Sequence, residues 1–210
     1  MKGHKWFAAI YDKMLASQEK KFLGAIRRKM LADVTGNILE IGAGTGANFQ
    51  YYPAGVRVTA IEPDPYMLDR ARNRASDAAA DIDLRQAPVE EMPFPDESFD
   101  FVIDTLVLCS VDDPARALAE IKRVLKPDGE LRLYEHVRYQ HPIGGLSQDL
   151  ISPAWQWFGA GCHPNRDTER YLREAGFELS DVRVRKDSPP IPPMVFTRPH
   201  LQAVARRPAK

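Results

Sequence analysis

"ILEIGAGTGANFQYYP", residues 38–53, joins a short apolar run to a loop of closely spaced glycines. The run Ile38–Ile41 predicts a buried strand, and Gly42, Gly44 and Gly46 follow where a strand gives way to a helix. Glycine lets the backbone approach a ligand closely, and the start of the following helix offers free N–H groups to an anion. The stretch therefore predicts a loop that holds a nucleotide-like ligand at the edge of a parallel sheet.

Helix and strand patterns alternate along the rest of the chain, which indicates an α/β fold with a mainly parallel sheet. The length of 210 residues suits one domain. We expect segment 136–166 to be irregular and the proline-rich stretch 188–193 to be a loop, because proline cannot donate to a strand ladder. Further strands are expected at 56–61, 82–85, 101–108, 131–135, 177–185 and 200–205, and helices at 7–15, 22–30, 65–79, 113–126 and 168–175.

Composition and charge exclude several classes of protein. The 29 basic side chains balance the 29 acidic ones, so no global field attracts nucleic acid. Cys109 and Cys162 form no CxxC pair and have no metal-type spacing with histidines, so we expect neither a disulfide framework nor a metal site. No apolar run reaches the roughly 18 residues of a membrane span, and residues 1–14 lack the pattern of a signal peptide. We therefore expect a cytoplasmic protein without integral membrane association.

Glu40 distinguishes between the two kinds of ligand that the glycine loop can hold. A dinucleotide presents a pyrophosphate, whereas S-adenosylmethionine presents a carboxylate and an ammonium group. The spacing alone leaves both open, because Ala47 also completes a GxGxxA pattern. A carboxylate two residues before Gly42 would repel a pyrophosphate but suits an ammonium group, so we expect S-adenosylmethionine. Glu62, at the end of the next strand, suits the ribose hydroxyls of either cofactor.

Four stretches resemble the class I S-adenosylmethionine-dependent methyltransferases of the type 11 kind: "EIGAGTG", "IEPDPYML", "EEMPFPDESFDFVI" and "EIKRVLKPDGELRL". They occur in the order and spacing of that family over nearly the whole chain. The resemblance implies a Rossmann-like, seven-stranded, mostly parallel sheet in the order 3-2-1-4-5-7-6, with strand 7 antiparallel and helices on both faces. It also implies one domain over 1–210, with a helical lid at 1–33 and an acceptor-side insertion at 136–166.

The same resemblance assigns cofactor contacts to positions in this chain. The loop would hold the methionine part of the cofactor, Glu62 with Pro63 its ribose, and Met67 would pack near the adenine. The family often has an acid where this chain has Pro88, so we expect backbone N–H groups nearby, such as that of Val89, to meet the adenine. The complete set of expected cofactor residues is Glu40, Gly42, Ala43, Gly44, Thr45, Gly46, Glu62, Pro63, Met67, Pro88, Val89, Glu90, Thr105 and Leu106.

A closer resemblance extends into the parts that select the acceptor. "IYDKMLASQEKKF", "TLVLCSV", "SPAWQW" and "GCHPNRDT" are similar to the methyltransferase-like thiol S-methyltransferases of animals. Members of that family begin with a hydrophobic anchor, and this chain starts where the anchor would end, so we do not expect their membrane location. The resemblance implies transfer of a methyl group to a small thiol, giving a methyl thioether.

His136, just after the fifth strand, is the candidate general base, because that strand end faces the cofactor crevice. A histidine there can equally cap the strand. The basic N-terminal helices are interpreted as a solvated face, with weak peripheral membrane contact as the alternative. The candidate residues of the acceptor pocket or lid are Tyr11, Met14, Cys109, Trp155 and Arg166, although aromatic residues at such spacing are more typical of a core, and Arg166 suits the anchoring of a loop.

Three functions follow from the sequence. The first is S-adenosylmethionine-dependent methylation of a small-molecule acceptor, most readily a thiol. The second is methylation of a lipid or isoprenoid, such as phosphatidylethanolamine or a quinone ring. The third, supported only by the glycine loop and Glu62, is an NAD(P)-binding oxidoreductase.

Overall fold

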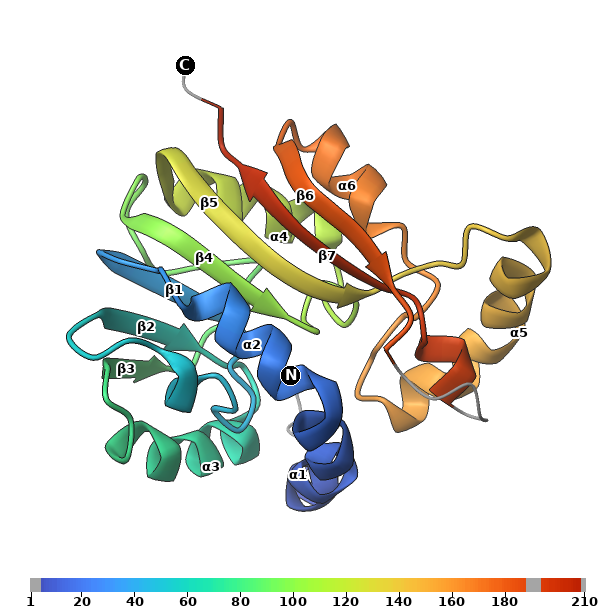
Figure 1. Ribbon diagram of the computed structural model, residues 1–210, viewed down its shortest axis with the longest axis horizontal. Helices are drawn as coiled ribbons and strands as arrows, with labels where there is room; N and C mark the ends of the chain where they lie inside the picture. Colours follow the sequence, from blue (N-terminus) through green and yellow to red (C-terminus); the bar gives the residue numbers. More distant parts are fainter. Residues whose placement is uncertain (1–4, 188–193, 209–210) are drawn as a thin grey trace.

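A computed structural model describes residues 5–187 and 194–208 and shows a central seven-stranded sheet (Figure 1). The strand order is β3-β2-β1-β4-β5-β7-β6, as the family resemblance implies. Neighbouring strands from β3 to β5 pair in parallel, and β7 pairs antiparallel with both β5 and β6. The strands are β1 Asn37–Ile41, β2 Arg57–Ile61, β3 Asp81–Arg85, β4 Phe99–Thr105, β5 Leu125–His136, β6 Glu178–Arg185 and β7 His200–Arg206.

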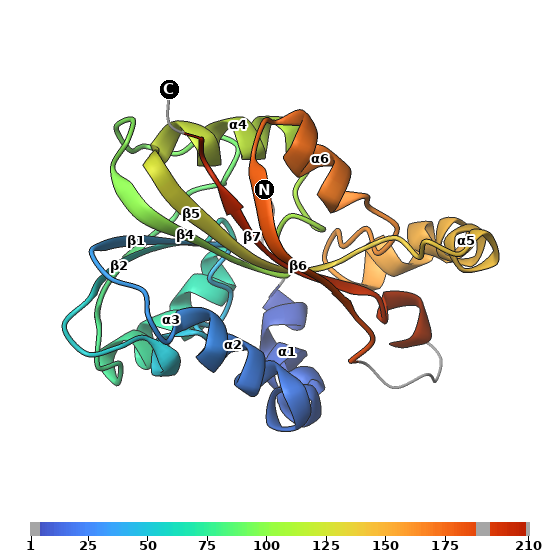
Figure 2. The same ribbon diagram turned by 45° about the horizontal axis from the view of Figure 1, so that its top comes forward.

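Helices cover both faces of the sheet (Figure 2). Leu118 and Leu172 belong to the core on the face of α4 and α6, and Ile26 and Ala71 to the core on the face of α2 and α3. Each face of a parallel sheet needs such a cover because its strands are apolar on both sides. The helices are α1 Lys5–Gln18, α2 Gly24–Leu31, α3 Pro65–Ser76, α4 Pro114–Val124, α5 Pro142–Phe158 and α6 Thr168–Glu174.

Asp-Pro pairs begin α3 and α4. The side chain of Asp64 accepts hydrogen bonds from backbone N–H groups in the first turn of α3, and Asp113 does the same for α4. The prolines follow at the first helical position, where a missing N–H costs no helical hydrogen bond. These starts agree with the sequence, whereas α3 ends three residues before the predicted 79.

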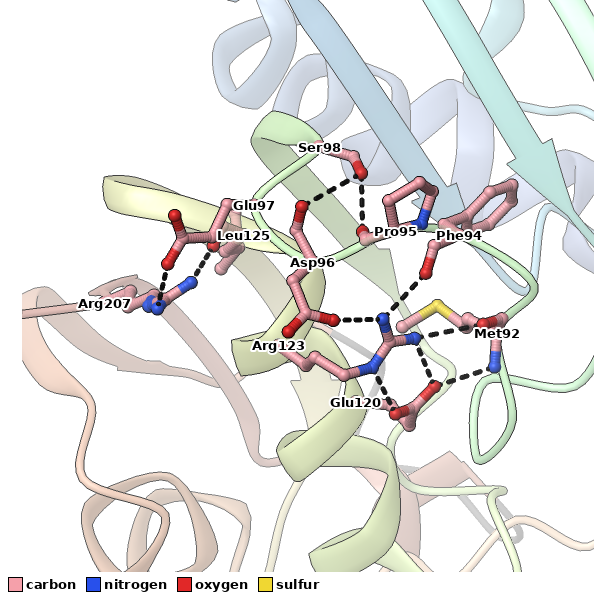
Figure 3. A network of polar contacts seen from close by, with 10 residues as sticks. All are labelled: Met92, Phe94, Pro95, Asp96, Glu97, Ser98, Glu120, Arg123, Leu125 and Arg207. Atoms are coloured by element: carbon pink, nitrogen blue, oxygen red, sulfur yellow. Dashed lines mark hydrogen bonds and ion pairs between the residues drawn. The ribbon is translucent and has the colours of Figure 1, made fainter.

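Arg123 of α4 binds the "MPFPDESF" stretch before β4 at several points (Figure 3). Its guanidinium donates to the carbonyl oxygens of Met92 at 3.0 Å and Phe94 at 2.7 Å. It also binds the carboxylates of Asp96 at 2.8 Å and Glu120 at 2.7 Å. This stretch of the family pattern is thus held in place by contacts within the protein itself.

The main departure from the predicted fold lies in segment 136–166. It contains α5, a helix of 17 residues, where we expected irregular structure. Pro153 inside the helix and two glycines near its start, Gly144 and Gly145, suggest breaks, but the N–H that Pro153 lacks is a local loss that the helix tolerates. Figures 1 and 2 show α5 projecting from the end of the sheet.

Smaller departures concern element ends. The strand predicted at 101–108 ends at Thr105, because Leu106 takes a positive φ of 64° and turns the chain. β5 begins at Leu125, six residues earlier than predicted, and the second helix is preceded by a π-helix at Glu19–Leu23. The predicted loop 188–193 lies outside the described residues. Within the described residues, no helix has both the length and the apolar character needed to cross a bilayer.

Candidate active site

A pocket opens where the glycine loop leaves β1. Strand β4 contributes Thr105, α1 contributes Tyr11 and α2 contributes Arg27. Ligands of doubly wound sheets bind at this kind of place, outside the carboxyl ends of neighbouring strands. The residues that line the pocket are Tyr11, Arg27, Glu40, Ile41, Gly42, Ala43, Gly44, Thr45, Ala47, Asn48 and Thr105.

The glycines of the loop are required for different reasons. Gly42, Gly44 and Gly46 all have positive φ, at 51°, 57° and 80°. A Cβ at Gly42 would lie 2.6 Å from the side chain of Val107, and one at Gly46 would lie 2.5 Å from that of Phe49. A Cβ at Gly44 would meet no atom closer than 3.9 Å. The space beside Gly44 is therefore open, and the loop leaves room there for a ligand to approach the backbone.

Glu40 is a buried carboxylate with two fixed partners. The Tyr52 hydroxyl donates to it at 2.7 Å and the Asn48 amide at 3.1 Å. Burial raises the pKa of Glu40 to about 7, although Tyr52, Arg27 and Asn48 act in the opposite direction. The carboxylate is thus held in one orientation and would gain from a cation beside it.

Arg27 was not expected at this site. Its side chain is only 5 % exposed, and Nη1 donates to the Asn48 oxygen at 2.7 Å. The sequence placed Arg27 on a solvated basic face, but it lines the pocket together with Glu40. One positive and one negative side chain beside an open glycine loop suit a ligand with a carboxylate and an ammonium group, as the methionine part of S-adenosylmethionine has.

Glu62 joins the glycine loop to the start of α3. Its carboxylate accepts the N–H of Gly44 at 2.8 Å and that of Asp64 at 2.9 Å. Burial raises the pKa of Glu62, and these two backbone bonds partly oppose the shift. Its role toward the ribose stays a prediction.

The other residues expected at the cofactor lie around the ends of β2, β3 and β4. Met67 and Val89 are buried, whereas Pro88 is exposed. The Pro63 carbonyl accepts a bond from Gln86 at 3.1 Å, and Glu90 accepts the N–H of Asp112 at 3.0 Å. Leu106 is half-buried at the turn after β4. Their contacts with the cofactor likewise remain predictions.

Helix α1 lies against the glycine loop. The Thr45 hydroxyl donates to Asp12 at 2.7 Å and accepts from Arg74 at 2.6 Å, and Arg74 also pairs with Asp12 at 3.0 Å. Tyr11 lines the pocket, and burial raises the pKa of its hydroxyl to about 12. Met14 is 53 % exposed and does not line the pocket, so the structure does not bring this predicted residue to it.

The loop after β4 is clamped from two sides. The Glu135 carboxylate, on β5, accepts the N–H groups of Val107, Leu108 at 2.8 Å and Cys109 at 2.9 Å. Arg166 donates to the carbonyls of Leu108 at 2.5 Å and Val111 at 2.9 Å. Arg166, predicted at the acceptor pocket, thus anchors this loop.

Asp104 lies beside Glu135 under the same loop. Burial, followed by the neighbouring charge of Glu135, raises the pKa of Asp104 well above its ordinary value. Burial also raises the pKa of Glu135, although its hydrogen bonds with Asp104 and Cys109 act in the opposite direction. Two carboxyl groups buried side by side disfavour the state in which both are charged.

His136 meets two cysteines at the end of β5. Its Nδ1 lies 3.4 Å from the sulfur of Cys162 and 3.7 Å from that of Cys109, and the two sulfurs are 3.6 Å apart. The distance in sequence gave no sign of this contact, because Cys109 and Cys162 are separated by 53 residues. The interaction with the Cys109 thiol lowers the pKa of Cys162 well below its usual range, and His136 adds to that effect.

The cluster changes the setting of the predicted base. Burial lowers the pKa of His136, but the Cys162 sulfur and the Glu135 carboxylate outweigh it and raise the pKa overall. Trp155 also reaches the cluster: its buried indole Nε1 lies near Cys162 and contributes to the lowered pKa of that thiol. Nδ1 of His136 is therefore engaged with sulfur rather than free, and its role as a base stays a prediction.

Comparison with known proteins identifies the class. The methyltransferase domain family matches residues 39–133, from β1 to β5. Together with the strand order and the relatives described next, this match shows that the chain belongs to the class I S-adenosylmethionine-dependent methyltransferases. S-Adenosylmethionine is the cofactor, and the NAD(P) alternative falls away.

The chain is similar to individual methyltransferases over different lengths. The chain is 35 % identical over 189 residues to the thiol S-methyltransferase TMT1B of Homo sapiens, covering 86 % of this chain and 75 % of that protein. It is 34 % identical over 130 residues to a phosphatidylethanolamine N-methyltransferase of Cereibacter sphaeroides, covering 59 % of this chain and 64 % of that protein. A crystal structure of a SAM-dependent methyltransferase from Thermotoga maritima shares the fold, with a TM-score of 0.72, 22 % identity and 97 % coverage of both chains.

Proposed function

We propose that this methyltransferase methylates the sulfur of a small thiol. The observation that carries the proposal is the extent of similarity to a thiol S-methyltransferase, which covers 86 % of the chain. The similarity to the phosphatidylethanolamine enzyme covers 59 %. The match to the thiol S-methyltransferase is the longer one, so it includes more of the chain outside residues 39–133, the part that matches the methyltransferase domain family.

The chemistry required of the chain is modest. The cofactor supplies an activated methyl group, so the protein has to bind both molecules, orient them and exclude water. Glu40 and Arg27 suit the two charges of the methionine part, Glu62 suits the ribose, and α1 with Tyr11 covers the pocket. A thiol of ordinary pKa, about 8.5, needs only moderate help to lose its proton near neutral pH.

His136, which contacts Cys109 and Cys162 at the end of β5, is where that help would come from. Cys109 follows β4 and His136 ends β5, and β4 also contributes Thr105 to the cofactor pocket. In the proposed function, His136 takes the proton of the acceptor thiol as a general base. Trp155 lies beside Cys162, and Arg166 holds the loop that carries Cys109.

A lipid acceptor is the second candidate, and α5 favours it. Apolar side chains on this helix are strongly exposed: Ile143 at 74 %, Leu146 at 69 %, Leu150 at 83 % and Trp157 at 78 %. Such a face suits a helix that lies in the interface of a membrane. The similarity to the phosphatidylethanolamine enzyme points in the same direction.

One assay separates the two candidates. The purified protein is incubated with S-adenosylmethionine and, in parallel, with an alkane thiol, phosphatidylethanolamine vesicles or a phenol, and release of S-adenosylhomocysteine is followed. We expect release with the thiol. Release with the vesicles and none with the thiol would make the lipid function the correct one.

A further inference from the structure

Three side chains that bind soft metal ions converge at the end of the sheet. Cys109 belongs to the loop after β4, His136 is the last residue of β5, and Cys162 precedes α6. Their ligand atoms all lie within 4.8 Å of one another. The mechanism proposed above uses only His136 and assigns no task to the pair of thiols.

The distances match a tetrahedral metal site. Zinc binds thiolate sulfur at about 2.3 Å and imidazole nitrogen at about 2.0–2.1 Å, so tetrahedral angles place two sulfurs about 3.8 Å apart and sulfur and nitrogen about 3.6 Å apart. The observed separations are 3.6 Å between the sulfurs, and 3.4 and 3.7 Å from the sulfurs to Nδ1. An ion therefore fits against the three atoms with shifts of a few tenths of an ångström.

The backbone holds these three ligands in place. The N–H of Cys109 donates to Glu135 at 2.9 Å, and its carbonyl accepts the N–H of His163 at 2.7 Å. The second bond links the segments that carry the two cysteines. His136 is fixed in β5 by its pairing with His200 of β7. Ligands oriented in this way before binding are a feature of functional metal sites.

We propose that Cys109, His136 and Cys162 form a binding site for a zinc-class ion with an open fourth position. Among the described residues, no further His, Cys, Asp or Glu joins the group. Structural zinc sites have four protein ligands, whereas catalytic sites have three and leave one position for water or substrate. The composition of two cysteines and one histidine is found among the catalytic sites.

The open position suits a thiol, and this step rests on the proposed thiol methylation. The sulfur–hydrogen bond of the acceptor breaks, its proton passes to solvent, and the sulfur binds the ion as a thiolate, with no oxidation or reduction. A coordinated thiol is deprotonated outright near neutral pH. The ion then activates the acceptor in place of His136 acting as a base.

Cobalt(II) is the probe for the metal site, because its visible spectrum reports thiolate ligation and tetrahedral geometry. The full chain, reduced and freed of metal by a chelator, is titrated with Co²⁺ without oxygen. We expect one ion per chain, a sulfur-to-cobalt charge-transfer band and displacement by Zn²⁺. Absence of that band, or an intact mass showing a Cys109–Cys162 disulfide formed in place of metal binding, would overturn the proposal.

Variants assign the ligands. Cys109→Ser, Cys162→Ser and His136→Asn should each weaken Co²⁺ binding by more than about tenfold, since even the loss of a supporting residue costs that much at metal sites. His141→Asn, at the exposed start of α5, should bind like the wild type. Circular dichroism and S-adenosylhomocysteine binding establish that each variant folds. Unchanged Co²⁺ binding in folded cysteine variants would contradict the assignment.

Adding an alkane thiol to the Co²⁺-loaded protein tests the fourth position. A shift of the cobalt bands is expected. A spectrum that does not change would exclude an open position for thiols, and thiol-dependent release of S-adenosylhomocysteine, measured separately, would show whether the proposed function stands without it.

Discussion

The hydroxyl of Tyr52 donates a 2.7 Å hydrogen bond to the buried carboxylate of Glu40, directly in front of the glycine loop. Asn48 binds the other carboxylate oxygen and connects it to Arg27. The acid that sequence patterns associate with the cofactor is therefore part of a buried network before any ligand arrives. This network explains how a carboxylate can be fixed in a pocket without a direct ion pair.

Replacing Glu40 by Gln should remove a pH dependence of stability. The pKa of Glu40 is raised from 4.5 to about 7, mainly by burial. A carboxyl group with a raised pKa stabilises the fold fully below its unfolded pKa and loses that contribution as the pH rises through the folded value. The free energy of unfolding of the wild type should thus fall relative to Glu40→Gln between about pH 4.5 and pH 7, by at most about 3 kcal/mol. Denaturant unfolding of both proteins across this pH range checks the prediction. Free energies of unfolding that change with pH by the same amount in both proteins would contradict it.

Arg27 should matter for cofactor binding although it lies on a basic helix. Arg27→Gln removes the cation of the Glu40 network, so we expect the dissociation constant of S-adenosylhomocysteine to rise by about tenfold or more. Lys29→Gln, an exposed change on the same helix, is the matched control. Calorimetric titration measures both. Equal affinities for the two variants would show that Arg27 does not serve the pocket.

Asp12 should hold α1 over the glycine loop. Its contacts with Thr45 and Arg74 are half-exposed, so Asp12→Ala should cost roughly 1 kcal/mol of cofactor affinity, a factor of about five. Cleavage of α1 by a protease should also become faster. Asp69→Ala, which breaks the exposed pair with Arg72, should change neither quantity.

Arg123 should contribute to stability rather than to binding. Arg123→Ala leaves the carbonyls of Met92 and Phe94 without their donor, so the free energy of unfolding should fall by about 2–3 kcal/mol. Arg116→Ala, which removes only a surface pair with Glu91, should lower the free energy of unfolding by less than about 1 kcal/mol. Urea unfolding compares them, and a similar small loss in both would refute the role of the loop network.

Local patterns explain why much of the fold was predictable. The helix starts at Asp64 and Asp113 depend on two adjacent residues, and the glycine loop depends on a few more. Such patterns depend only on residues that are close together in the sequence, so tertiary contacts do not alter them. Glu40 and Glu62 were also predicted from nearby residues. In the structure Glu40 lines the pocket and Glu62 binds the glycine loop.

The parts that escaped prediction depend on tertiary structure. A π-helix at Glu19–Leu23 alters the helical register before α2, and a shift by one residue rotates a helical face by roughly 100°. Arg27 follows Leu23 by four residues and precedes Met30 by three, so it lies with them on the buried face of α2, although its charge favours a position in solvent. Cys162 lies beside Cys109 where hydrogen bonds from His163 and Arg166 join their two segments. No spacing along the chain encodes that contact.

The central claim, that a thiol sulfur receives the methyl group, is tested most directly by the fate of an isotopic label. S-Adenosylmethionine carrying a deuterated methyl group is supplied together with an alkane thiol and phosphatidylethanolamine vesicles, and both products are analysed by mass spectrometry. We predict the label in a methyl thioether. Label in the phospholipid, with none in the thioether, would contradict the claim.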